Sequence, residues 1–571
     1  MNPLLILCKR TFSIKLGVNY NLYNFTKRRK NLTKRSIFSI GDLLQAVQTA
    51  EVFPQEEDYL EKKLKYPVAD VLDNFQTLKK EFGGTIPAAE SMKSFIRDNF
   101  EDQASTEPWV PTDWLEEPLI FDRIWDDELK KWALNLNTMW KQLGKKVSKA
   151  VCDNPDLFAT YCLPNGFITT ERRNNSMFYW SSYWIINGLL VCGMFRTARG
   201  MIDNLTYLLD TVGHIPMGSQ MYYEGRTGPP MLALILDLYL TYSGDFDYIQ
   251  KNINFVIKEL EYWDKERSTQ VQHKGKVYKF YRYCRKIAGP RPENYRIDKD
   301  IASLGISNAE MLERYIAIQS AVESGWHFSS RWVNVRGDNK GNITDTHTQS
   351  IIPVDLNSIV HKSFVLLSEW YNILGEYRQK ALYQTKAQVL LNSIESVLWN
   401  KKNGIWFDYD VFNNKPRNYF YLSNLAPLWT ESYTFSRQQV LESTLIYLNR
   451  YLMDKYEGGL PASVEYSSEK WDFPNAWPPL QSYIIQGFDK LGLEDGTNVA
   501  FHFAQKWIRT VYNGFQKNGK LYEKYDSLLV GSPGDLENYV SLDGVGWTLG
   551  VVFQLLERWG PSLKPTDDSS S

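Results

Sequence analysis

Apolar residues recur at helical spacing along almost the whole chain, whereas few segments show the strict alternation of a half-buried strand. In residues 436–452, leucines follow a four-three-four spacing behind a Ser-x-x-Gln capping box. Residues 387–398 repeat the pattern, and residues 231–240 are apolar nearly all round, which predicts a helix buried on every side. Gly- and Pro-rich stretches at 458–461 and 531–534 are typical of loops. The sequence therefore predicts an all-α protein whose motifs lie in the connections between helices.

Length and charge limit the kind of partner that this chain can bind. Its 571 residues exceed the usual size of one domain, yet closed helical architectures of this length can form one unit. The formal net charge of -1 provides no overall cationic field, which argues against nucleic acid and favours a neutral ligand. No apolar run approaches the roughly 18 residues of a membrane-spanning helix, so we expect no membrane span.

The first forty residues differ from the rest of the chain. They contain nine Lys and Arg residues, and no acidic residue precedes Asp42. Such N-termini resemble organelle transit peptides, and a start codon assigned too early would give the same pattern. Secretion is the alternative, although the apolar run 4–8 is shorter than a usual signal-peptide core. We expect a basic targeting or disordered segment at 1–40, one domain at 41–560 and a disordered tail at 561–571.

Cysteine and histidine are too scattered to indicate a metal site. The five cysteines are Cys8, Cys152, Cys162, Cys192 and Cys284. Their spacing fits neither a disulfide framework nor a zinc site, so we expect buried thiols. The six histidines are equally dispersed. The sequence therefore implies no metal ligands and no cofactor.

Several motifs occur in one order along the chain. They are the blocks at 179–184, 213–216, 290–295, 323–332, 352–357, 471–481, 523–526 and 544–548. In this order, over roughly residues 40–560, they resemble the trehalases, inverting hydrolases that split α,α-trehalose into two glucoses. The resemblance implies an (α/α)6 toroid of paired helices, with an active site built from loops at one end. It also implies trehalose or a related disaccharide as the ligand.

The motif at 323–332 departs from that family at its chemical centre. Inverting hydrolysis needs a carboxylic acid that protonates the leaving oxygen and a carboxylate that activates water from the opposite face. By resemblance the base is Glu523, whereas His327 stands at the position of the general acid, which is an Asp in the family. An imidazole can donate a proton near its ordinary pKa of about 6.5. However, the ring is longer than an Asp carboxyl, and its charged form adds a cation to the site.

The expected sugar-binding positions are only partly retained. By resemblance, the retained ones are Arg173, Trp180, Arg226, Arg291, Glu293 and Gly325. Guanidinium groups beside a carboxylate suit the vicinal hydroxyls of a sugar. Four family residues are replaced: an Asp by Ser181, an Asn by Met217, a Gln by Gly228 and a Glu by Asn538. Mismatched polar partners of this kind can weaken catalysis on the order of 10⁴-fold.

The preferred interpretation of these changes is a trehalase-like protein with much reduced or lost hydrolytic activity. Three alternatives stay open at this point. The chain could be a residual trehalase that uses His327 as its acid, a non-catalytic sugar-binding or regulatory paralogue, or a structural partner that no longer binds sugar. The sequence does not identify a protein partner.

Overall fold

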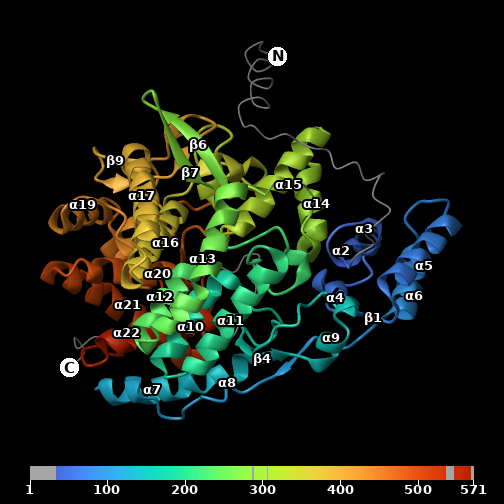
Figure 1. Ribbon diagram of the computed structural model, residues 1–571, viewed down its shortest axis with the longest axis horizontal. Coiled ribbons are helices and arrows are strands. Elements are labelled where there is room, and N and C mark those ends of the chain that lie inside the picture. The colour runs from blue at the N-terminus through green and yellow to red at the C-terminus, as the bar shows by residue number, and fades with distance from the viewer. Residues whose placement is uncertain (1–33, 286–288, 305–306, 535–544, 567–571) are drawn as a thin grey trace.

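The computed structural model describes residues 34–285, 289–304, 307–534 and 545–566, and most of them are α-helical (Figure 1). Six helices form a closed ring in which each contacts the next and the last contacts the first. In ring order they are α10 (Tyr179–Val191), α12 (Leu232–Ser243), α16 (Val354–Ile373), α18 (Ala426–Thr430), α20 (Pro478–Lys490) and α22 (Gly546–Trp559). The predicted all-α fold, an (α/α)6 toroid, is confirmed.

A second layer of helices surrounds this ring. Its members include α7 (Asp127–Asn137), α11 (Phe195–Val212), α13 (Phe246–Glu266), α17 (Tyr377–Ser393), α19 (Arg437–Arg450) and α21 (Glu494–Asn518). Helix α17 packs on α16, α21 packs on α20, and α13 packs on α12. Because outer helices face solvent on one side, α13 buries only one stripe of its residues, whereas every residue of α10 is buried.

Helices α10 and α22 approach each other unusually closely. The cause is a pair of glycines: a Cβ on Gly550 would lie 2.0 Å from the carbonyl oxygen of Trp184, and a Cβ on Gly188 would lie 2.7 Å from the Cα of Gly550. Only residues without a side chain allow this contact. The contact joins the first and last helices and so closes the ring.

The segments predicted from periodicity are helical, with one boundary corrected. Residues 232–236 of α12 are all buried, and α17 continues as a π-helix over Ile394–Leu398. Helix α19 begins after Ser436, whose Oγ accepts from the backbone N–H of Gln439 as a capping residue. It ends at Arg450, so the predicted extension to residue 452 is wrong: Leu452 has a positive φ of 52° and is 61% exposed. The stretches 458–461 and 531–534 are loops, as predicted.

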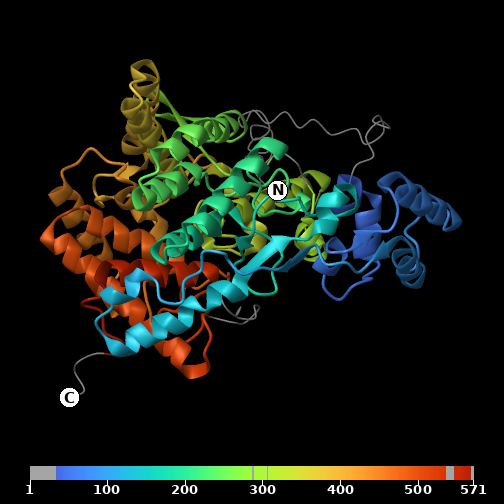
Figure 2. The ribbon, with the colours of Figure 1, turned by 60° about the horizontal axis from the view of Figure 1, so that its bottom comes forward.

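The described residues up to residue 99 form a separate helical layer at one edge of the molecule, whereas residues 120–124 pack into the main core (Figures 1 and 2). It consists of α2 (Arg35–Phe38), α3 (Asp42–Thr49), α4 (Glu57–Leu60), α5 (Val68–Glu81) and α6 (Ala89–Asn99). These helices share their own apolar cluster, which meets the barrel at residues 221–223. Residues 1–33 and 567–571 lie outside the described residues, so the predicted boundaries at 40 and 561 stay predictions.

The remaining α-helices range from 5 to 16 residues. The helices are α8 (Met139–Leu143), α9 (Lys149–Asp153), α14 (Tyr295–Ser303) and α15 (Asn308–Glu323). The longest strands, β6 (Ser268–His273) and β7 (Lys276–Tyr281), pair as an antiparallel hairpin, which stands out at the top of Figure 1. Strand β13 (Asn475–Ala476) pairs with β14 (Tyr525–Asp526) and so joins two of the motifs found in the sequence.

One expectation about the cysteines is wrong. Cys152 and Cys162 form a disulfide that ties α9 to the segment before residue 163. Their Cα atoms lie 5.0 Å apart, a proximity that the sequence spacing did not reveal. Cys192 and Cys284 are buried thiols, as expected, and Cys8 lies outside the described residues. Across the described ranges, no helix is both long and apolar enough for a membrane span.

Candidate active site

The motif 323–332 forms a loop after α15, and its first residue is anchored by charge. The Glu323 carboxylate is fully buried and accepts from the Arg267 guanidinium, with Nη2 2.7 Å from Oε1. The backbone N–H of Thr227 donates to the same oxygen at 3.1 Å. A buried carboxylate with several donors is held in one position, so the start of the loop is fixed relative to β6 and α12.

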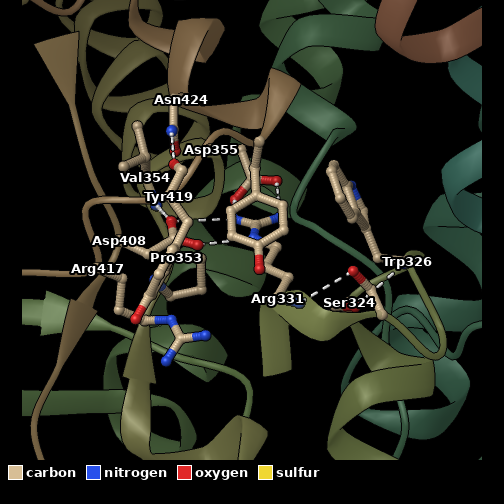
Figure 3. A network of polar contacts seen from close by, with 12 residues as sticks. Ser324, Trp326, Arg331, Pro353, Val354, Asp355, Asp408, Arg417, Tyr419 and Asn424 are labelled. Atoms are coloured by element: carbon tan, nitrogen blue, oxygen red, sulfur yellow. Dashed lines mark hydrogen bonds and ion pairs between the residues drawn. The ribbon is translucent and has the colours of Figure 1, made fainter. Parts of the chain in front are cut away.

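A buried ion network anchors the far end of the loop (Figure 3). Arg331 is fully buried and donates to Asp355 at 2.7 and 2.9 Å and to Asp408 at 2.7 and 3.1 Å. Its guanidinium carbon lies 4.7 Å from the ring centroid of Trp326 and 4.6 Å from that of Trp332. Five N–H donors in a planar fork suit two carboxylates at once, which Lys could not match.

Asp472, in the block 471–481, holds the centre of the loop. It accepts from the Ser329 hydroxyl at 2.8 Å and from the backbone N–H of Ser330 at 2.6 Å. Next to it, Trp471 stacks on Trp326 with ring centroids 5.2 Å apart. Nothing in the sequence of this block indicates a role for Asp472. Its side chain is the physical link between the two motifs.

His327 lies between these anchors in a left-handed conformation. Its φ is +51°, a region in which His, Asn and Asp are enriched among residues other than Gly. The loop backbone therefore suits the family Asp as well as the His. The imidazole is half-buried, and its Nδ1 lies 3.2 Å from the carbonyl oxygen of Gly325.

The surroundings of His327 oppose its charged form. Burial is the largest cause that lowers the pKa of the imidazole, to about 3, and the nearby charges of Lys470 and Arg291 act in the same direction. At pH 7 a group with this pKa carries its proton in roughly one molecule in ten thousand. As placed, His327 is a neutral ring with no acidic proton to give.

Glu523, the candidate base, is engaged by a neighbouring cation. The Lys470 ammonium lies 3.1 Å from Oε1 and 2.8 Å from Oε2 of the carboxylate. The two side chains are only 16% and 19% exposed, so water screens the pair weakly. The Glu523 backbone is fixed in turn, because Trp547 Nε1 donates to its carbonyl oxygen at 3.2 Å. The charge of Lys470 also lowers the pKa of His327, so Lys470 acts on both predicted catalytic residues.

The expected sugar-binding arginines are paired with protein carboxylates. Arg226 is fully buried and contacts Glu293 at 2.5 and 2.9 Å, and Arg291 contacts Asp298 at 2.7 Å. Burial is the largest single cause and would raise the pKa of Glu293, but the charge and hydrogen bonds of Arg226 and the charge of Arg291 together hold the pKa below its usual value. The Arg291 guanidinium lies 5.5 Å from the ring centroid of Phe328, beside His327. The carboxylates hold both guanidinium groups in fixed orientations.

Trp180 and Gly325 form one contact at the entrance of the ring. Trp180 begins α10 and lies against Trp471 and Trp547, each with its ring centroid 5.7 Å away. Gly325 has a φ of +80°, and a Cβ there would lie 3.0 Å from the Trp180 ring. A side chain at position 325 would therefore be strained by its backbone and would press on the indole.

Arg173 is the exception among the predicted site residues. It lies exposed on the loop 170–175, and within the described residues no hydrogen bond or ion pair joins it to the other predicted site residues. Of the replaced positions, Ser181 is buried in α10, and Met217 is half-buried. A Cβ on Gly228 would meet only ordinary contacts, 3.6 Å or more away. Asn538 lies outside the described residues.

Sequence reasoning missed Lys470 and the anchoring residues of the loop. Lys470 directly precedes the Trp-Asp block, but its partner lies 53 residues further along the chain. Only the pairing of β13 with β14 brings them together. Within the described part of the chain, no group of three or more His, Cys, Asp and Glu side chains is placed to hold a metal ion.

Comparison with known proteins connects this geometry to one family. The trehalase family model matches residues 51–560. The chain is 37% identical to the trehalase of Homo sapiens over 529 residues, which are 92% of this chain and 90% of that protein. It is 35% identical to the trehalase of Apis mellifera over 533 residues, 93% of this chain and 85% of that protein. The solved neutral trehalase of Saccharomyces cerevisiae shares the fold, with a TM-score of 0.56 at 19% identity over 70% of this chain and 75% of that one.

Proposed function

The chain belongs to the trehalase family of glycoside hydrolases, and from this membership we propose that it binds trehalose or a related disaccharide but hydrolyses it poorly or not at all. One observation carries the proposal: the Lys470 ammonium contacts both oxygens of the candidate base and also acts on His327. A single side chain thus opposes both proton-transfer groups of the inverting mechanism.

The acid half of the reaction lacks a proton donor. The leaving glucose oxygen must be protonated as the glycosidic bond breaks, and this step contributes about 10²–10⁴-fold to the rate. With its pKa lowered to about 3, His327 is neutral at neutral pH. A neutral imidazole N–H is far too weak an acid for this role, which argues against a residual trehalase that uses His327.

The base half lacks a free carboxylate. To activate water, a carboxylate needs an oxygen directed at the water, which takes up a proton as the water attacks. The ammonium of Lys470 contacts both oxygens of Glu523. The water would have to displace Lys470 or bind beside it.

Sugar recognition has more support than hydrolysis. Arg226 with Glu293, and Arg291 beside Phe328, keep a rigid polar wall, and Trp180 places an indole at the start of α10. These features favour a sugar-binding paralogue over a structural partner that has lost the ligand. The replaced positions Ser181, Met217, Gly228 and Asn538 remove polar partners and would weaken that binding.

Two measurements on the full chain test this proposal. Incubation with trehalose should release glucose at least about 10³-fold more slowly than an active relative, because both proton-transfer groups are compromised. Calorimetric titration with trehalose should show saturable binding. Turnover comparable to that of the relative, and abolished by Glu523→Gln, would overturn the loss of activity. Absence of both turnover and binding would favour the structural partner instead.

A further inference from the structure

A cavity of about 280 Å³ lies at the end of the helical ring that faces away from His327. Helices α10, α20 and α22 start beside the candidate active site, near Trp180, Trp477 and Trp547. All three contribute to the cavity with their last turns, and Asn187 lies seven residues after Trp180, or roughly 10 Å along the helix axis. The two sites therefore occupy opposite ends of the same ring.

Aromatic rings separate the cavity from the candidate active site. Trp429 stacks on Tyr483 with centroids 4.3 Å apart, and Tyr483 lies 5.9 Å from Trp184. All three side chains are buried in the middle of the ring. Because this layer fills the interior, a ligand in the cavity would not touch the residues around His327.

The cavity wall contains a buried polar atom that lacks a partner. Asn187 is 2% exposed, and its Oδ1 has no hydrogen-bond partner among the described residues. Gln554 and Gln486 stand beside it, connected through Ser482: the Ser482 hydroxyl donates to Gln554 Oε1 at 2.9 Å and accepts from Gln486 Nε2 at 2.7 Å. A buried carbonyl oxygen that is left unpaired is costly, so a hydroxyl donor from a ligand would satisfy it.

Charged groups around the cavity are balanced. Asp237 on α12 faces Lys362 and Lys490, and Lys362 in turn pairs with Glu431 at 3.2 Å. Lys490 donates to the carbonyl oxygen of Trp429 at 3.0 Å. Desolvation lowers the pKa of Lys490 to about 8 and raises that of Asp237, so both charges are poorly hydrated. The charged residues that line the cavity are three acids, Asp237, Asp489 and Glu557, and three bases, Lys362, Lys490 and Arg558, which leave no net charge to select an ion.

We infer that this cavity binds one neutral, polyhydroxylated ring of monosaccharide size. Hydroxyl groups both donate and accept, which matches a wall made of amides, a carboxylate and amines. The rings of Tyr183, Trp429 and Trp559 also line the cavity and provide apolar surface for the ring carbons. The volume lies just below the range of about 300–1,000 Å³ typical of drug-sized ligands, which favours one sugar ring over two.

The test is a calorimetric titration of the full chain with D-glucose, in the original protein and in two matched variants. Thr241→Trp fills the cavity from its rim, where Thr241 is exposed and donates to the carbonyl oxygen of Asp237 at 2.8 Å. Thr385→Trp is the control, because Thr385 is exposed on α17 and makes the same bond to Ala381, at 2.8 Å, away from the cavity. We expect saturable glucose binding that Thr241→Trp weakens at least tenfold and Thr385→Trp leaves unchanged.

A third variant, Asn187→Leu, removes the unpaired oxygen and should also weaken glucose binding at least tenfold. If Asn187→Leu does not fold, the comparison of the two tryptophan variants still decides the question. Glucose binding that Thr241→Trp leaves unaffected would place the sugar elsewhere and overturn the inference. Absence of saturable glucose binding would overturn it as well, and so would saturable binding of glycine betaine without binding of glucose, because the ligand class would then be zwitterionic.

Discussion

Lys470 bridges the two oxygens of the Glu523 carboxylate, with its ammonium 3.1 Å from one oxygen and 2.8 Å from the other. The pair connects the loop before β13 to the loop before β14, and the pairing of these strands fixes the distance between the loops. Lys470 is therefore placed by the fold and is not a mobile surface cation. Its charge also lowers the pKa of His327, after burial as the larger cause, so one residue contacts the candidate base and acts on the residue at the acid position.

Replacing Lys470 by Gln should raise the pKa of His327. The present pKa of about 3 results first from burial and next from the Lys470 charge, so removal of that charge leaves burial as the main cause. We expect an increase of about one unit, still below the ordinary value of about 6.5. The measurement is an NMR titration of the imidazole C–H signals. Lys415→Gln, which alters an exposed lysine, serves as the control, and an equal shift there would contradict this explanation.

The lowered pKa of His327 also predicts how stability changes with pH. Between about pH 6.5 and pH 3 the unfolded chain binds a proton at this position and the folded chain does not, so stability falls as pH falls. From pH 6.5 to pH 5 the loss from His327 should be about 1–2 kcal/mol. His327→Asn tolerates the positive φ, has no titrating ring and should remove this part of the slope. Urea unfolding at several pH values measures how the free energy of unfolding depends on pH. A pH dependence that His327→Asn leaves unchanged would contradict a neutral His327 ring.

The Arg331 network should contribute far more to stability than an exposed ion pair. Arg331→Met leaves Asp355 and Asp408 buried without their guanidinium, and we expect a loss of about 3–5 kcal/mol. Arg558→Met breaks the exposed pair with Asp489, whose arginine is 50% exposed, and should cost about 1 kcal/mol or less. Denaturant unfolding compares the two. Similar losses would mean that the buried network does not anchor the His327 loop.

A pair of glycine substitutions separates backbone strain from the contact with Trp180. Gly325→Ala combines a φ of +80° with a Cβ 3.0 Å from the indole, whereas Gly244→Ala has a φ of +66° and nothing within 4 Å. Both substitutions should cost roughly 1–2 kcal/mol in backbone strain. Only Gly325→Ala should also alter the near-ultraviolet circular dichroism of the tryptophan cluster. If the spectrum of Gly325→Ala is identical to that of the original protein, the Trp180 indole moves away easily.

Single helices were predictable from local periodicity, whereas the closed ring was expected only from the family resemblance. The apolar run 231–240 and the repeat 387–398 are properties of short segments, and tertiary packing preserved both. Leu452 illustrates the limit: its spacing continues the pattern of α19, but the helix ends at Arg450 and Leu452 is itself left-handed. Periodicity identifies a buried stripe and does not show where the chain turns.

The candidate site was only partly predictable, because its electrostatics depend on distant residues. The resemblance brought Arg226, Arg291, Glu293 and Glu523 into one list, but no local pattern indicates that Lys470 contacts Glu523. The disulfide between Cys152 and Cys162 was missed for the same reason, since a turn of the chain sets the distance between the two Cα atoms.

Reversion of the site tests whether His327 is the decisive loss or one of several. His327→Asp restores a carboxyl group on a backbone that accommodates Asp, but Lys470 would pair with Glu523 and attract the new carboxyl as well. A carboxyl held ionised by a cation cannot serve as the acid. We therefore expect little or no glucose release from His327→Asp alone, and measurably more from His327→Asp combined with Lys470→Gln.

Adding Ser181→Asp, Met217→Asn, Gly228→Gln and Asn538→Glu to that double variant should increase glucose release further, because positioning and proton transfer act on the same bound sugar. A Cβ at position 228 meets no close contact, so the Gln there is sterically allowed. Each variant is compared in a glucose-release assay, with Glu523→Gln in the same background as the control for chemistry at this site. Full activity from His327→Asp alone would show that neither Lys470 nor the four polar replacements impair the site.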